Sequence, residues 1–115
     1  LCCVGNRYQT ADATSSVSNM QIENVVTETP VPNIFQIAPD PSTPVNIQNL
    51  TLSNWNVSMP MNTAFTNQII GNAVSQPISG FTFDKFDFNG TNLTQDNWQT
   101  ELQVTTNNLE TPVVQ

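Results

Sequence analysis

The apolar positions of this chain recur in the same arrangement three times. The segments 17–27, 47–57 and 78–88 align without a gap. The copies begin at Val17, Ile47 and Ile78, so the offset between successive copies is nearly constant. Three copies of one apolar frame at a near-constant offset indicate a repeat protein.

Within each segment the pattern predicts a strand that turns a corner. Residues two apart share one face of a strand, and two polar residues interrupt that alternation before it resumes. A strand that bends over two residues and keeps its apolar side inward describes one coil of a parallel β-helix. The first apolar pairs are Met20/Ile22, Leu50/Leu52 and Phe81/Phe83, the polar pairs are Glu23-Asn24, Ser53-Asn54 and Asp84-Lys85, and the alternation resumes at Val25, Trp55 and Phe86.

Stacking such coils predicts which side chains lie over one another. One apolar column contains Ile22, Leu52 and Phe83, and a second contains Val25, Trp55 and Phe86. At the corner, Asn24 lies over Asn54, where stacked side-chain amides satisfy one another. Trp55 is therefore expected in the core rather than against a sugar.

The rest of each repeat has room for a third strand, expected within residues 33–37, 64–70 and 98–105, with connecting turns at 39–44 and 71–77. No segment of more than ten residues has helical periodicity. The predicted fold is all-β, a right-handed parallel β-helix. Its parts are the end of a preceding coil and a linker in 1–16, about three coils in 17–105, and a C-terminal tail in 106–115. A β-sandwich or jelly roll also has short strands between turns, but it gives no reason for one frame to recur in register.

Composition excludes several classes of function. The 115 residues hold 2 basic and 9 acidic side chains, for a net charge of −7, so the sequence predicts no binding to nucleic acid or to an anionic membrane. No apolar run approaches the roughly 18 residues that span a bilayer. The chain has no histidine, which excludes a His-based triad or a His-ligated metal built from this chain alone.

The first residues are apolar and include two adjacent cysteines. An apolar start, Leu1-Cys2-Cys3-Val4, suits a segment of a larger protein whose first strand packs on preceding material; a mature chain that begins there is the alternative. Adjacent cysteines rarely bond to each other because the ring is strained. Cys2 and Cys3 are either small buried hydrophobes or bonded to a partner outside this chain.

Four Asn-x-Ser/Thr sequons are candidates for N-glycosylation. Asn89 and Asn92 flank an Asn-Gly turn and are expected to be accessible, whereas Asn49 and Asn56 fall in or beside strands. A chain with 16 Asn and 15 Thr also produces such triplets by chance.

Residues 78–98, Ile-Ser-Gly-Phe-Thr-Phe-Asp-Lys-Phe-Asp-Phe-Asn-Gly-Thr-Asn-Leu-Thr-Gln-Asp-Asn-Trp, resemble the closing coils of right-handed β-helix polysaccharide hydrolases. In those proteins a last coil ending in an Asn-Gly turn leads to a short segment with Asn-Trp. The dextranase and isopullulanase family is the closer match, and the polygalacturonase family is second. The resemblance extends over roughly residues 17–105 and concerns the pattern of coils.

The resemblance implies a secreted, extracellular enzyme that cleaves a polysaccharide with inversion. Inversion needs two carboxyl groups roughly 6.5–9.5 Å apart, and the family carries paired or closely spaced aspartates that this chain lacks. No catalytic residue is therefore assigned, and the catalytic carboxylates are expected upstream of Leu1. Asp84 and Asp87 are the nearest local pair, and we interpret them as solvated surface residues. Trp98 either covers the open end of the coils or contacts substrate.

The first hypothesis is thus a C-terminal structural segment of a secreted glycoside hydrolase, acting on an α-glucan such as dextran or, second, on pectin. Its expected partners are the remaining coils of the same β-helix and the polysaccharide, with no cofactor and no metal. A viral coat or spike component released from a polyprotein is the first alternative, because the chain ends in Gln115. A non-catalytic β-helix adhesin or sugar-binding stalk is the second.

Overall fold

The computed structural model describes residues 2–4, 15–38, 45–60 and 66–115. Most of the linker expected in 1–16, the turn expected at 39–44 and the start of the strand expected from residue 64 lie outside these ranges. The described residues are mostly strands, arranged in largely parallel sheets, with one short helix. The predicted all-β class is therefore confirmed. The elements are β1 Cys2–Val4, β2 Ser15–Val26, β3 Phe35–Ile37, β4 Val45–Val57, β5 Asn67–Ile70, β6 Thr82–Phe88, β7 Thr91–Asn92, α1 Trp98–Leu102, β8 Val104–Asn107 and β9 Val113–Val114.

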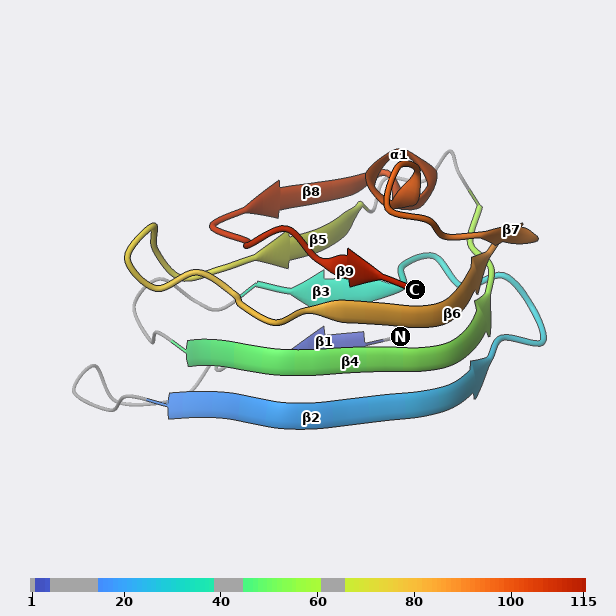
Figure 1. The fold of residues 1–115 in the computed structure, drawn as a ribbon. Coiled ribbons are helices and arrows are strands. Elements are labelled where there is room, and N and C mark those ends of the chain that lie inside the picture. The colour runs from blue at the N-terminus through green and yellow to red at the C-terminus, as the bar shows by residue number, and fades with distance from the viewer. Residues whose placement is uncertain (1, 5–14, 39–44, 61–65) are drawn as a thin grey trace.

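Apart from the β6–β7 hairpin, the chain passes alternately through two sheets. A short sheet has the order β1-β3-β5-β8 and is parallel throughout, whereas a long sheet has the order β2-β4-β6 and is extended on β6 by antiparallel β7 and parallel β9. Figure 1 shows the long strands one above another, with the short sheet behind them and α1 at the end of the stack opposite β2. Each strand therefore neighbours the strand of the same sheet from the next repeat.

The register of the long sheet confirms both predicted columns. Ile22 pairs with Leu52 and Leu52 with Phe83. Val25 pairs with Trp55 and Trp55 with Phe86. Trp55 is only 2% exposed and stacks on Phe86 with ring centroids 5.3 Å apart, so its predicted place in the core is also confirmed.

Left-handed residues reset the alternation along each long strand. The predicted corner contains Asn24, Asn54 and Lys85, with φ of 61°, 56° and 51°. A second set occurs five residues earlier, at Asn19, Asn49 and Gly80, and was not predicted. Asparagine and glycine adopt this conformation more readily than other residues. Two apolar stretches separated by such a residue can therefore both face the interior.

The first part of the strand expected in residues 98–105 is a helix. Residues 98–102 form α1 instead of strand, because Trp98 and Leu102 are four apart and bury the same side of one helical turn. Gln103 ends the helix in the left-handed conformation, and β8 follows directly. Residues 106–115, expected as a tail, contain β9, which pairs in parallel with β6.

Candidate functional site

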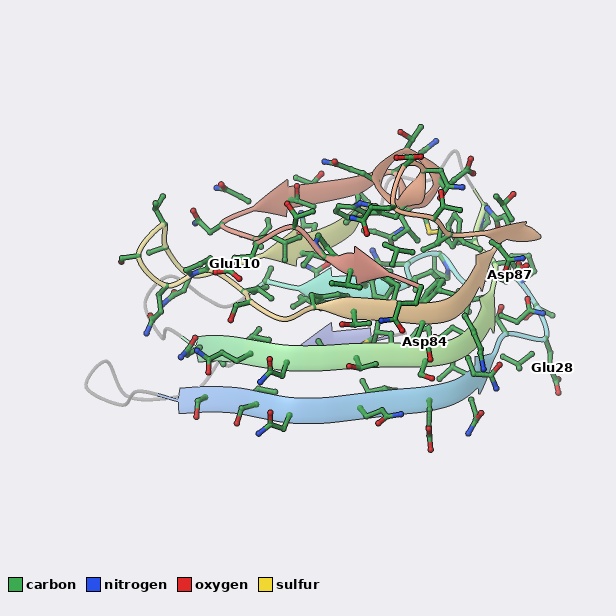
Figure 2. All side chains as sticks on the ribbon, in the orientation of Figure 1. Glu28, Asp84, Asp87 and Glu110 are labelled. Carbon is green, nitrogen blue, oxygen red and sulfur yellow. The ribbon has the colours of Figure 1, made fainter. Side chains whose placement is uncertain are left out.

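Four of the described carboxylates lie at separate places on the structure. Figure 2 shows Glu28, Asp84, Asp87 and Glu110 on different parts of the surface, and no two of them face each other. Asp84 accepts a hydrogen bond from the Ser53 hydroxyl at 3.2 Å, and Asp87 accepts one from the Gly90 backbone N–H at 2.9 Å. Both aspartates therefore have structural partners, and the four labelled carboxylates do not form a pair that faces a common point.

Metal binding also lacks a basis in the part of the chain that the structure describes. No group of three or more Cys, Asp or Glu side chains there is arranged to hold an ion. The helix among these residues is too short to cross a lipid bilayer. Neither result identifies a function.

Trp98 lies at the core boundary rather than on an open surface. Its side chain is 8% exposed, and its ring lies 6.0 Å from that of Phe83 in a tilted arrangement. Leu93 and Leu102, on either side of it in sequence, are 5% and 0% exposed. A side chain that stacks on a sugar presents a ring face to solvent, so this burial supports the covering role over the substrate contact.

The four sequon asparagines fall into two groups. The Asn49 side chain donates to Asn19 Oδ1 at 3.0 Å. The Asn89 amide accepts from the Met59 N–H at 2.9 Å and donates to the Met59 carbonyl at 3.1 Å. Asn56 and Asn92 are exposed and make no side-chain hydrogen bond to another described residue. A glycan on the amide nitrogen of Asn49 or Asn89 would break these hydrogen bonds. A glycan on Asn56 or Asn92 would break none.

Asn67, which the sequence analysis did not single out, is the one fully buried polar side chain among the described residues. Its Oδ1 accepts from the N–H groups of Ile34 and Phe35 at 3.0 and 3.1 Å. Its Nδ2 donates to the Leu102 carbonyl at 2.8 Å and contacts the sulfur of Met59 at 3.3 Å. The side chain thus joins the start of β3 to the end of α1. The sequence signal was its place at the start of an apolar run, where a polar residue must find partners.

The two ends of the stack differ in how they are covered. At the β6 end, β9 pairs along β6, and Gln95 joins the adjoining segments by donating to the Pro112 carbonyl at 2.8 Å and accepting from Val114 N–H at 3.1 Å. At the β2 end, Met20 is 38% and Val26 67% exposed. Leu50, the register partner of Met20 on β4, is fully buried.

Two columns of asparagine amides join β4 to β2, whereas Gly80 and Lys85 occupy the equivalent positions of the third repeat. Asn49 donates to Asn19 at 3.0 Å, and Asn54 donates to Asn24 at 2.7 Å. The second pair is the amide ladder predicted at the corner, and it is confirmed. The first pair was missed, although Val17 and Met20 are three residues apart instead of two, as are their counterparts in both later repeats.

No protein-family model, no curated protein and no solved structure matches this chain. The geometry and the sequence pattern therefore carry the functional argument.

Proposed function

We propose that this chain is the closed end of a right-handed parallel β-helix, and that its role is to extend and terminate a stack of coils. The single observation that supports this most is the parallel register of the long sheet, which reproduces the near-constant offset of the sequence repeats. Successive strands of one sheet related by a constant offset are the arrangement expected of stacked repeats.

The difference between the two ends supports a terminal position. Repeat proteins need an end unit with a polar outer face, because an uncovered last repeat exposes apolar surface and unpaired strand edges. Here α1, β7 and β9 cover the last repeat, whereas β2 pairs with β4 alone among the described strands. The segment that joins β7 to α1 is polar on its outer side, with Thr94, Gln95 and Asp96 exposed.

The parent protein, in this proposal, is a secreted glycoside hydrolase that cleaves a polysaccharide with inversion. The resemblance of residues 78–98 to the closing coils of such enzymes favours an α-glucan such as dextran, with pectin second. The separation of Glu28, Asp84, Asp87 and Glu110 fits a structural role here, with the catalytic carboxylates on preceding coils.

The test is the mass and activity of the native protein that contains this sequence. We expect a polypeptide much larger than 12.7 kDa, with hexose-rich heterogeneity, that hydrolyses dextran and releases a product of inverted anomeric configuration in a time-resolved NMR assay. The isolated chain is expected to be inactive on dextran and polygalacturonate.

Other results would support the alternatives. A homogeneous chain with the mass of this sequence alone, purified with particles, would replace the hydrolase with a viral coat component. A large glycosylated protein that binds a polysaccharide without cleaving it would replace the hydrolase with a sugar-binding stalk.

A further inference from the structure

The outer edge of β2 has no paired strand among the described residues, and its inward side chains are only partly buried. Along β2 the inward positions Val17, Ile22 and Val25 are only half-buried, whereas Ile47, Leu52 and Trp55, which pair with them on β4, are at most 2% exposed. The same side-chain positions therefore become fully buried once a strand lies on each side. One more parallel strand on β2 would bury its apolar face equally.

The two asparagine columns also indicate that β2 can pair with a further strand. Asn19 and Asn24 each use Oδ1 to accept a hydrogen bond from β4, and their Nδ2 groups have no acceptor among the described residues. Since an amide carries both a donor and an acceptor, each column ends at β2 with a donor directed away from β4. The two donors are five residues apart on the edge strand.

We infer that this edge binds a parallel strand that carries side-chain carbonyl acceptors at two positions five residues apart and apolar residues between them on its inward side. This rests on the stacked-coil part of the proposed function and specifies the partner that the open end takes. The occupant is one further coil of the same pattern, whose asparagines would continue both columns by accepting from Asn19 and Asn24.

A second copy of this chain fits the edge poorly. The outer edge of β2 in a copy presents the same two donors, so two such edges would bring donors together rather than donors and acceptors. The opposite end of a copy is covered by α1, β7 and β9, so head-to-tail stacking would require displacing them. A separate strand that offers side-chain acceptors can accept from both donors and does not require α1, β7 or β9 to move.

The test uses the intact chain and a fluorescent, end-blocked peptide with the β4 sequence Val45–Val57, which carries asparagines at the required spacing. The informative variant is Asn19→Asp combined with Asn24→Asp. Each aspartate keeps the oxygen that accepts from Asn49 or Asn54 but removes the outward N–H donor. Asn92→Asp with Gln115→Glu is the matched control, since it adds the same charge at exposed sites on the β6 side of the stack.

We expect saturable binding of the peptide to the wild-type chain and to the control, and binding about tenfold or more weaker for the Asn19/Asn24 variant, the loss expected for two hydrogen bonds. Hydrogen exchange should slow in β2 on binding and stay unchanged in β8. Equal affinity of the two variants, or binding no better than that of a scrambled peptide, would overturn the inference. So would a dimer in sedimentation that excludes the peptide, because a second copy would then occupy the edge.

These outcomes are separable from those of the proposed function. If the chain binds the peptide but its parent protein does not hydrolyse polysaccharide, the interface stands and the proposed enzyme is wrong. If the parent protein hydrolyses polysaccharide but this chain does not bind the peptide, the proposed enzyme stands and the interface is wrong.

Discussion

Asn67 holds separate segments together through one side-chain amide. Because the residue is fully buried, every hydrogen bond that it makes lies away from water, where an unpaired backbone N–H or carbonyl is costly. Its partners are the N–H groups of Ile34 and Phe35, at the start of β3, and the carbonyl of Leu102, at the end of α1. Each partner lies about one repeat away from Asn67 along the chain. Its loss would affect both sides of the core at once.

Replacing Asn67 by alanine should lower the free energy of unfolding by about 3–5 kcal/mol, because three buried backbone groups lose their partner and a small cavity forms. Urea denaturation followed by tryptophan fluorescence measures the change. Asn56→Ala, at an exposed position without a side-chain partner, is the control and should change stability by less than about 0.5 kcal/mol. Similar effects for both variants would contradict the role of Asn67.

The Asn-Gly turn gives a second contrast between neighbouring asparagines. Asn89 has φ of 51° and holds both backbone groups of Met59, whereas Asn92 holds nothing with its side chain among the described residues. In unglycosylated protein, Asn89→Gln should therefore cost about 1–3 kcal/mol of unfolding free energy, and Asn92→Gln should be close to neutral. Thermal denaturation of the two variants compares them directly; a neutral Asn89→Gln would show that the pairing with Met59 is not stabilising.

Sequence pattern predicted the residues whose role follows from spacing, and missed those whose role follows from distant partners. The column of Val25, Trp55 and Phe86 was predictable, because constant offsets determine which residues pair. Asn67 was not, because its partners are backbone groups that only the folded chain brings together. Asn19 and Asn49 stand between these cases, since the three-residue gap beside them was visible but was not interpreted as a second left-handed position.

At the scale of elements, α1 is short but covers the last repeat. A five-residue helix has little stability of its own, so its position depends on the burial of Trp98 and Leu102. The repeat pattern predicts a strand here because residues 98–105 follow the third repeat, as residues 33–37 and 64–70 follow the first two. The third strand of the last repeat is present as β8, which pairs with β5, and α1 is an additional element before it that no repeat-based argument predicts.

Trp98→Ala should destabilise the protein by about 3–5 kcal/mol, the usual cost of removing a buried aromatic side chain. Thr100→Ala on the exposed side of the same helix is the matched control and should have little effect. Both are measured by chemical denaturation followed by far-ultraviolet circular dichroism. A Trp98 variant as stable as the control would mean that the indole does not help to cover the end of the stack.

Close backbone approach between repeats makes a further prediction. A Cβ on Gly71 would overlap the carbonyl of Asn108 and lie 2.9 Å from the Ile78 nitrogen, whereas a Cβ on Gly90 would meet nothing within 4 Å. Gly90→Ala should therefore cost only the left-handed conformation, about 1–2 kcal/mol. Gly71→Ala should cost more, about 3 kcal/mol, because backbone must move. Melting temperatures rank the two variants, and the opposite order would contradict the close approach.

At the scale of the whole molecule, stability should vary along the stack. β4 pairs on both sides, with β2 and β6, whereas β2 pairs with β4 alone among the described strands. Regions with fewer buried contacts open locally at lower free energy. The coarse architecture of such a molecule is predictable from its repeats, but the difference between its ends depends on segments outside the repeat.

Native-state hydrogen exchange should therefore show the strongest protection in β4 and β6 and the weakest among the long strands in β2. Mass spectrometry of peptides from the three strands measures this order. Uniform protection, or the strongest protection in β2, would indicate that the edge of β2 is already covered in the isolated chain.

The first two long strands share one pattern of apolar columns and asparagine amides, and among the described residues only the β6 side of the stack is covered. In the proposed assembly, duplication of a gene segment encoding a single repeat would lengthen the rod by one unit without redesigning either terminus. The length of the proteins that share this fold would then change by one repeat at a time, and the covered β6 side would remain the end of the stack.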